Sequence, residues 1–343
     1  MKVLITGYNT CCFNKSGGVQ VRVKKIHDLL SHRENIEVEY FRPMETDFDN
    51  VDILHLFKLE PEFLGLIVKA KNQGVKVVLS SIVSMTYGRR IDAYRLLFNK
   101  IPIPNIYKMK QRIMDLVDCV ITETKMEADF IMKHYGVSKK KIRIIPNGIE
   151  MEYYEGNEIY EEIGEKKDFV LQVGRIDSNK NQLNAIKSLK DTDIDFVIIG
   201  GPEKTNSSYM KACKEEASNR GNIHFLGWLD KSSPILKSAY AHAKVLLFPS
   251  YHETFGLVAL EGAVNGCNIA MTKTLPIHDF HVFDDCWLFN PNDVNDIRQK
   301  VLAAYVAPRT DDTKKKVLET FSWNKIIDEH IEIYKALSNG IAK

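Results

Sequence analysis

Residues 243–264 read AKVLLFPSYHETFGLVALEGAV, a strand pattern followed by a loop and the start of a helix. Ala243 to Phe248 are mostly apolar and end at Pro249, which is typical of a buried strand. The apolar spacing from Leu257 onward predicts a helix. In α/β proteins, ligands bind where the carboxyl end of a strand faces the start of a helix. This stretch therefore predicts both an α/β fold and a candidate site.

Two carboxylates bracket the turn. Glu253 lies in the loop, and Glu261 lies inside the expected helix, about two turns further on. Taken singly, each has an ordinary structural alternative, because an acid near a helix start stabilises the helix dipole and an acid on a helix surface is common. Neither residue alone identifies a function.

The totals indicate a folded protein with two domains, because 343 residues exceed one ordinary core. No apolar run approaches the roughly 18 residues of a membrane span. The chain starts with a strand pattern at Lys2 to Thr6, so we expect no secretory signal. The six cysteines form no CxxC pair and no metal-ligand spacing with histidine, which favours reduced thiols in the cytoplasm.

Charge is unevenly distributed. Residues 1–150 hold 24 Lys and Arg against 17 Asp and Glu, whereas the remainder holds 23 against 28. A basic half beside an acidic half suggests a surface that meets an anionic partner. The net charge of +2 and the absence of a recognised motif argue against nucleic acid as that partner.

Strand and helix patterns alternate through most of the chain, which predicts parallel sheets with crossover helices. One series occupies residues 1–150 and another occupies 151–322, and a segment rich in glutamate, 150–167, lies at the crossing. We therefore expect two doubly wound, Rossmann-like domains.

Two further motifs suit phosphate binding. Arg175 leaves the first strand pattern of the second domain and Lys180 begins the next helix, so both cations converge on one sheet edge, although loops are commonly charged for no such reason. Gly17 and Gly18 precede the first helix and allow backbone N–H groups to approach a ligand closely. A plain loop-to-helix turn explains the two glycines equally well.

The ordered combination of these motifs resembles the GT4-type retaining glycosyltransferases of the GT-B fold. The resemblance rests on Gly17-Gly18, Pro146-Asn147-Gly148, Gly174-Arg175 with Lys180, and the pair Glu253 and Glu261. It implies two Rossmann-like domains facing a central cleft: 1–150 would bind the acceptor and 151–322 the nucleotide sugar. A final helix over about 323–343 would cross back to the first domain.

The resemblance also implies roles for individual residues. Arg175 and Lys180 would neutralise the donor diphosphate, Glu253 would hold the donor sugar, and all three would be catalytic. Glu261 would bind the ribose hydroxyls. The remaining donor-site residues that the resemblance implies are Gly17, Gly18, Gly201, Leu226, Phe255, Gly256 and Leu257.

The activity implied is transfer of a sugar from a nucleotide-diphosphate donor to a glycan or lipid-linked glycan, in bacterial surface polysaccharide synthesis, by a hexosyl- or glycosyltransferase that needs no metal and no cofactor. The location implied is the cytoplasm or the inner face of the membrane. The alternative is a GT-B sugar-nucleotide protein that reacts differently, as an epimerase does, or only binds.

One departure from the family concerns a histidine. Members often carry a Thr-x-His motif after the fourth strand of the first domain, but residues 77–84 here read VVLSSIVS. Ser81 and Tyr87 are candidates to replace it on the acceptor side. His55 is a third candidate, and a packed histidine at the end of a strand is its alternative.

The segment from Tyr87 to Arg112 is basic and rich in apolar and aromatic residues. Its cations are Arg89, Arg90, Arg95, Lys100, Lys108, Lys110 and Arg112, against the single acid Asp92. This composition fits an interfacial element on anionic lipid. It fits equally an ordinary loop and helix whose apolar residues pack inside and whose cations face water.

Overall fold

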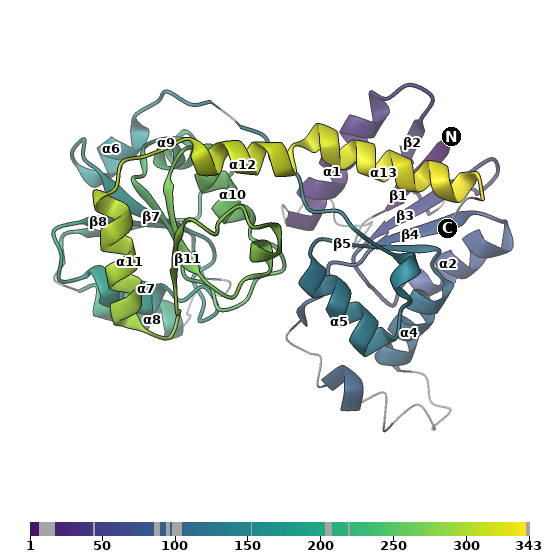
Figure 1. Ribbon diagram of the computed structural model, residues 1–343, viewed down its shortest axis with the longest axis horizontal. Coiled ribbons are helices and arrows are strands. Elements are labelled where there is room, and N and C mark those ends of the chain that lie inside the picture. Colours follow the sequence, from purple (N-terminus) through teal and green to yellow (C-terminus); the bar gives the residue numbers. More distant parts are fainter. Residues whose placement is uncertain are drawn as a thin grey trace. The chain divides into compact units, whose positions relative to one another are not determined.

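The computed structural model describes residues 1–6, 18–43, 45–85, 90–93, 97, 105–151, 153–202, 208–218 and 220–340. The chain divides into two compact units (Figure 1), Met1–Asn147 with Trp323–Lys343 and Gly148–Ser322. The sequence analysis set the corresponding boundaries at residues 150 and 322. Gly17 and Tyr87 lie outside the described residues.

The first unit is a parallel sheet with the strand order β2-β1-β3-β4-β5-β6. Its strands are β1 (Lys2–Thr6), β2 (Glu37–Tyr40), β3 (Ile53–Phe57), β4 (Lys76–Ser80), β5 (Cys119–Thr122) and β6 (Ile142–Ile144). Its helices are α1 (Gly18–Ser31), α2 (Phe63–Asn72), α4 (Ile106–Leu116), α5 (Lys125–Tyr135) and α13 (Trp323–Ser338), with the short 3-10 turn η2 (Lys139–Lys141).

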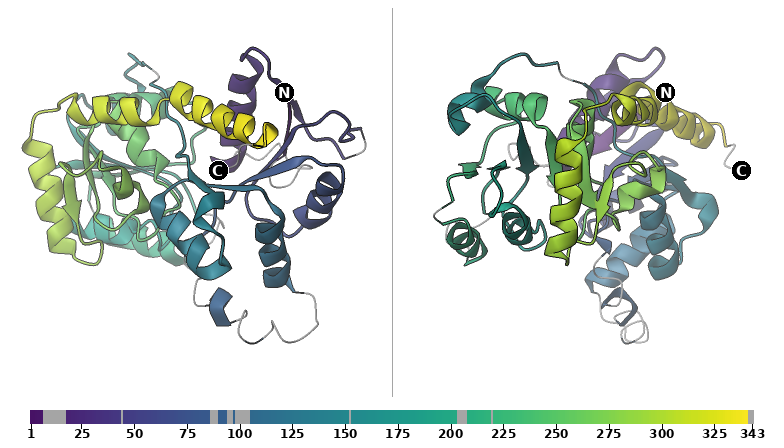
Figure 2. Two further views of the ribbon diagram at one scale, coloured as in Figure 1. Left: turned by 45° about the vertical axis from the view of Figure 1, so that its right-hand side comes forward. Right: turned by 60° about the vertical axis from the view of Figure 1, so that its left-hand side comes forward.

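Alternation along β1 explains the layers of this unit, because successive side chains of a strand point to opposite faces. Val3 and Ile5 lie in the core beneath α1 and α13, whereas Leu4 lies in the core beneath α2, α4 and α5. The C-terminal helix α13 buries Ile326 and Tyr334 in the first of these cores. It therefore belongs to the unit that contains the N-terminus, as Figures 1 and 2 show in yellow.

The second unit is a parallel sheet with the strand order β12-β11-β10-β7-β8-β9. Its strands are β7 (Phe169–Val173), β8 (Asp195–Ile199), β9 (Ile223–Gly227), β10 (Val245–Phe248), β11 (Asn268–Thr272) and β12 (Trp287–Phe289). Its helices are α6 (Glu158–Ile163), α7 (Gln182–Leu189), α8 (Ser208–Glu216), α9 (Pro234–His242), α10 (Leu257–Val264), α11 (Val294–Val306) and α12 (Asp312–Phe321), with the 3-10 turn η3 (Pro276–Phe280).

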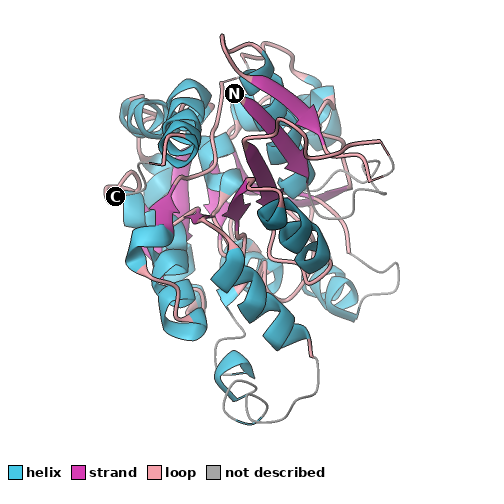
Figure 3. Ribbon diagram, turned by 90° about the vertical axis from the view of Figure 1, so that its right-hand side faces the viewer, coloured by secondary structure: helices cyan, strands magenta, loops and turns pink. Residues whose placement is uncertain are grey.

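Helices cover both faces of this sheet as well. Figure 3, in which the first unit faces the viewer, shows strands (magenta) with helices (cyan) around them. Leu246 and Phe248 of β10 point into the core with α9, α10 and α12, whereas Val245 and Leu247 point into the core with α7, α8 and α11. The predicted α/β class with two parallel sheets is confirmed. The sequence analysis missed β12, which is only three residues long, and α12.

The strand order reverses between β7 and β10. The chain runs outward from β7 to β8 and β9 on one side, and from β10 to β11 and β12 on the other. Connections leave the two central strands in opposite directions, and doubly wound proteins bind ligands at the carboxyl ends of such strands. The loops 174–181 and 249–256 follow these two strands.

Candidate functional site

The two loops at this switch point bring Lys180 and Glu253 together. The Lys180 Nζ lies 2.5 Å from Glu253 Oε1 and 5.7 Å from the centroid of the Phe248 ring. The Lys180 and Glu253 side chains are 16% and 14% exposed. The residues are 73 positions apart in sequence, so only the adjacency of β7 and β10 makes this pair possible.

Arg175 lies in the same loop and is more exposed, with 48% of its side chain accessible. Its guanidinium is 3.5 Å from Asp177 Oδ2, and Asp177 Oδ1 accepts a hydrogen bond from the Lys180 backbone N–H at 3.0 Å. Asp177 thus shapes the turn that carries both predicted phosphate-binding cations. The sequence analysis did not identify this role of Asp177, although an aspartate three residues before a loop lysine is a known turn signal.

Three glycines let the strand ends approach one another. Gly174 and Gly200 have φ of 148° and 140°, and a Cβ on Gly200 would lie 1.9 Å from the Gly174 carbonyl oxygen. A Cβ on Gly201 would lie 2.5 Å from the indole of Trp228, which is 60% exposed at the end of β9. Gly201 therefore lies against the exposed Trp228 ring, directly after β8. Leu226, in β9, is half-buried.

The start of α10 follows the Glu253 loop directly. Gly256 has φ of 123°, a conformation that favours glycine, and it precedes the helix that begins at Leu257. The Phe255 side chain points into the core, with its ring centroid 5.7 Å from that of Phe321. Only backbone groups of Phe255 and Gly256 are thus left for a ligand, and the first N–H groups of a helix lack intrahelical partners.

Glu261 is oriented by two neighbours. The Tyr240 hydroxyl donates to Glu261 Oε2 at 2.7 Å, and Lys231 Nζ donates to Oε1 at 3.3 Å. Tyr240 is buried, and both its burial and the Glu261 charge raise its pKa well above the ordinary value. The phenol therefore stays protonated and remains a donor. Sequence reasoning predicted a role for Glu261 but missed Tyr240.

The candidates of the first unit have internal partners. His55 is fully buried, with Nδ1 2.7 Å from the Tyr334 hydroxyl and Nε2 2.9 Å from Ser80 Oγ. Burial lowers its pKa well below the ordinary value, helped by the nearby His330 and Arg22 charges. With both nitrogens engaged inside the unit, the geometry favours the packing alternative for His55.

Ser81 and Gly18 also have ordinary surroundings. Ser81 Oγ donates to Glu127 Oε1 at 2.7 Å and to the Ile121 carbonyl at 3.2 Å. Burial, and secondarily the Glu123 charge, raise the pKa of Glu127 to about 7, against the opposing effect of its hydrogen bonds. Gly18 is the first residue of α1, and a Cβ there would meet none of the described residues within 4 Å. Within the described part of the chain there is therefore no steric reason for glycine at position 18.

A buried ion pair in the first unit was not anticipated. Arg22 of α1 is 1% exposed, pairs with Glu123 after β5, and donates to the Ile145 carbonyl at 3.3 Å. Arg22 and Glu123 are 101 positions apart, and the charged residue on an otherwise amphipathic helix gave no local signal of burial.

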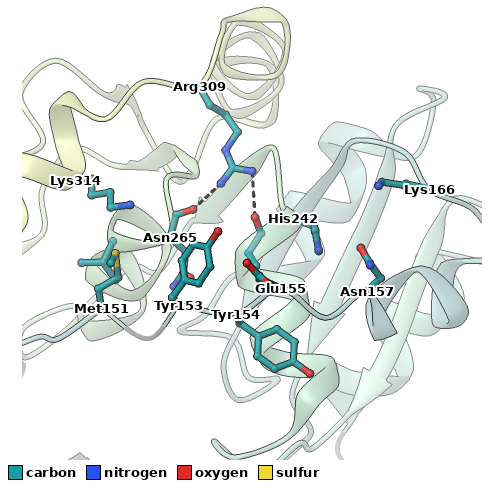
Figure 4. Close-up of a pocket in the computed structure, with 12 residues that line it drawn as sticks. Met151, Tyr153, Tyr154, Glu155, Asn157, Lys166, His242, Asn265, Arg309 and Lys314 are labelled. Atoms are coloured by element: carbon teal, nitrogen blue, oxygen red, sulfur yellow. Dashed lines mark hydrogen bonds between the residues drawn. The ribbon is translucent and has the colours of Figure 1, made fainter.

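A cavity of about 490 Å³ lies elsewhere in the second unit (Figure 4), near the amino ends of β10 and β11. Arg309 donates there to the Ala241, Asn265 and Gly266 carbonyls at 3.1, 2.5 and 2.7 Å. These carbonyls belong to the ends of α9 and α10, where a cation is stabilising. The guanidinium therefore closes two helix ends, at the opposite edge of the sheet from Glu253.

Among the described residues, no group of three or more His, Cys, Asp or Glu side chains could hold a metal ion. In the same part of the chain, none of the helices has the length and apolarity needed to cross a membrane.

The fold and the paired loops define a protein of two doubly wound units with a candidate anion site at the switch point of the second. Two family models match the chain: Glycosyltransferase Family 4 over residues 20–153, and Glycosyl transferases group 1 over residues 158–316. The chain belongs to the GT4-type glycosyltransferases, and the resemblance noted from its motifs is confirmed.

Individual relatives are distant. An uncharacterized glycosyltransferase of Methanocaldococcus jannaschii is 26% identical over 235 residues, which cover 63% of this chain and 59% of that protein. A processive diacylglycerol alpha-glucosyltransferase of Acholeplasma laidlawii is 23% identical over 305 residues, covering 86% and 83%. The crystal structure of Anabaena HepE in complex with UDP is similar with a TM-score of 0.75 at 14% identity, covering 98% and 100%. That similarity establishes the GT-B fold.

Proposed function

We propose that the protein is a retaining, metal-independent glycosyltransferase that moves a sugar from a nucleoside-diphosphate donor to a glycan or lipid-linked glycan. The observation that carries the proposal is the pairing of Lys180 with Glu253 at the switch point, directly before the start of α10. Each group at this strand end suits one part of such a donor. The cation suits the diphosphate, the carboxylate suits the sugar hydroxyls, and the helix N–H groups suit the negative charge that develops as the diphosphate leaves.

In this mechanism the nucleoside diphosphate is the leaving group, so negative charge develops on its phosphate oxygens. Arg175, Lys180 and the first N–H groups of α10 stabilise that charge electrostatically. The acceptor hydroxyl attacks from the face that the diphosphate leaves, which retains the anomeric configuration, and the departing phosphate takes the hydroxyl proton. Glu253 accepts hydrogen bonds from the donor sugar.

Glu261 binds the ribose in the same proposal. Tyr240 holds one carboxylate oxygen, and the other is bonded to the exposed Lys231 side chain, which a ribose hydroxyl can displace. The base lies toward Gly201 and Leu226, where Trp228 offers an exposed aromatic face. Burial and bonding of Tyr240 fix Glu261 before the nucleotide arrives, which lowers the entropic cost of binding.

The proposed acceptor is membrane-borne, in the synthesis of a bacterial surface polysaccharide. In support, one relative is named a processive diacylglycerol alpha-glucosyltransferase, whose named acceptor is a lipid. The described part of the basic segment supplies a second argument: α4 buries Ile113 and Met114 but leaves Ile106 51% exposed, and the same helix carries Lys110 and the exposed Arg112.

The donor is identified by a thermal-shift screen of UDP, GDP and ADP and their sugars. We expect one nucleotide series to raise the melting temperature, because a ligand at 100 times its Kd stabilises the fold by about 2.7 kcal/mol. The matching sugar nucleotide is then incubated with acceptor extract, and release of nucleoside diphosphate is measured. If a sugar nucleotide binds but none of the donors is turned over, the proposed transferase activity is refuted, and the protein is a sugar-nucleotide binding protein.

Membrane contact is tested separately with the cations of α4. Replacing Lys108, Lys110 and Arg112 by glutamine is expected to weaken binding to phosphatidylglycerol vesicles about 100-fold, since each cation near an anionic surface contributes about 1 kcal/mol. Vesicle co-sedimentation measures the change, and hydrolysis of the donor should be unaffected. The matched control replaces Lys133, Lys139 and Lys140, three exposed cations of the same unit. Equal vesicle binding by the α4 variant and the native protein would contradict the lipid role.

A further inference from the structure

Asn179 joins the two loops of the candidate site. Its side-chain Nδ2 donates to the His252 carbonyl at 2.8 Å, and its Oδ1 accepts from the His252 N–H at 3.1 Å. The Tyr251 N–H also donates to the Asn179 carbonyl at 2.8 Å. One asparagine thus makes three hydrogen bonds to two successive residues of the other loop, which resembles a short sheet bridge.

These bonds lie next to the pair that the proposed reaction uses. Asn179 immediately precedes Lys180, and His252 immediately precedes Glu253. The bond to the His252 N–H holds the peptide plane before His252, and the bond to its carbonyl holds the plane that leads into Glu253. The Lys180–Glu253 ion pair cannot hold this geometry during the reaction, because the donor diphosphate attracts Lys180. The Asn179 bonds are neutral and do not involve either charged group.

Neighbouring amides extend the connection to a third loop. Asn181, at φ of 57°, is 3% exposed and donates from Nδ2 to the Pro291 carbonyl at 2.8 Å. Asn184 donates to the same carbonyl and to the Tyr251 hydroxyl, each at 3.2 Å. The loop that carries Lys180 is therefore bonded on one side to Pro291 and on the other to the loop that carries Glu253.

We propose that Asn179 is a positioning residue that holds the Glu253 loop in its sugar-binding geometry throughout the reaction. The inference rests on the proposed function for its kinetic consequence, but the loop connection itself is a property of the ligand-free protein. Because a displacement of about 1 Å at a reacting group can lower a rate about 100-fold, loss of the side chain should act on kcat more than on nucleotide binding.

The test compares Asn179→Ala with Asn222→Ala. Asn222 is a matched control: its Nδ2 donates to the Thr192 and Ile194 carbonyls at 2.9 and 2.8 Å, and its own carbonyl accepts from Phe196 N–H at 2.8 Å. It joins two loops of the same sheet at the amino ends of β8 and β9, away from the site. Each variant loses two side-chain hydrogen bonds to backbone groups: one donated and one accepted for Asn179, and two donated for Asn222.

For Asn179→Ala we expect kcat to fall about 10- to 100-fold, with less than about 3-fold change in the Kd of the nucleoside diphosphate identified in the screen. Hydrogen exchange of the His252 N–H should accelerate in the ligand-free protein. Asn222→Ala should match the native protein in both measurements.

Native kcat in Asn179→Ala, or unchanged exchange at His252, would overturn the proposal. An equal loss of kcat in Asn222→Ala would overturn it too, because the effect would then be general destabilisation. If the native protein turns over no donor, the proposed function fails. The exchange measurement then decides by itself whether Asn179 holds the loop, so the two failures are distinguishable.

Discussion

Replacing Glu253 with alanine is expected to abolish sugar transfer, by a factor on the order of 1,000 or more, while the nucleoside diphosphate still binds. Glu253 carries the contact to the sugar in the proposed mechanism, so its loss removes donor orientation at the reacting carbon. Its loss also removes the negative charge 2.5 Å from Lys180 Nζ. The ammonium is then available to phosphate at no cost, and nucleotide affinity should stay equal or rise.

Isothermal titration with the nucleoside diphosphate and a release assay with the sugar nucleotide measure the two effects. Glu216→Ala is the matched control, because Glu216 pairs with Lys190 at 2.6 Å on the surface of the same unit with comparable exposure. It should leave both quantities unchanged. Lost nucleotide binding together with intact transfer in Glu253→Ala would reverse the assigned role, since the residue would then serve the nucleotide rather than the sugar.

Replacing Glu123 with alanine is expected to destabilise the first unit by about 3–5 kcal/mol. The change leaves the Arg22 guanidinium buried, with a hydrogen bond to the Ile145 carbonyl at 3.3 Å within the described part of the chain. Arginine does not lose its proton in proteins, so the guanidinium cannot escape this cost by becoming neutral. A loss of this size is a large part of the roughly 5–15 kcal/mol that stabilises an ordinary protein.

Urea denaturation, followed by hydrogen exchange of β1 and β5, reports on this unit. The control is Asp328→Ala, which breaks the exposed pair of Asp328 with Arg33 and should cost less than about 1 kcal/mol. The double variant Arg22→Met, Glu123→Leu should recover much of the lost stability, because well-packed apolar residues can replace a buried pair. A cost below about 1 kcal/mol for Glu123→Ala would show that water reaches Arg22.

The fold was largely predictable because its signals are local. Apolar runs such as Val245–Phe248 and helix spacings such as that from Leu257 recur along the chain, and their alternation specifies parallel sheets. The loops after β7 and β10 were predictable as a site for the same reason, since strand ends and glycines mark them. The strand β12 was not predicted, and its three residues are too few to show the two-residue alternation of a strand.

Partners of individual side chains were not predictable. Lys180 and Glu253 were each named from the motifs, but their contact depends on β7 lying beside β10. Asn179 looked like any polar loop residue, although its amide holds His252. For His55 the sequence left both a site role and a packing role open. Its Nδ1 forms a hydrogen bond with the hydroxyl of Tyr334, 279 positions away, which no local pattern indicates.

The sequence by itself determined the two doubly wound sheets, the strand ends that form the candidate site and the family to which the chain belongs, because periodicity, glycine positions and motif order are properties of neighbouring residues. Only the tertiary structure decided which charges meet, which are buried and which loops are joined. Strand order brings Lys180 to Glu253, 73 positions away, and the packing of α13 on the first sheet brings Tyr334 to His55, 279 positions away. Local sequence patterns do not indicate contacts between residues so far apart in the chain.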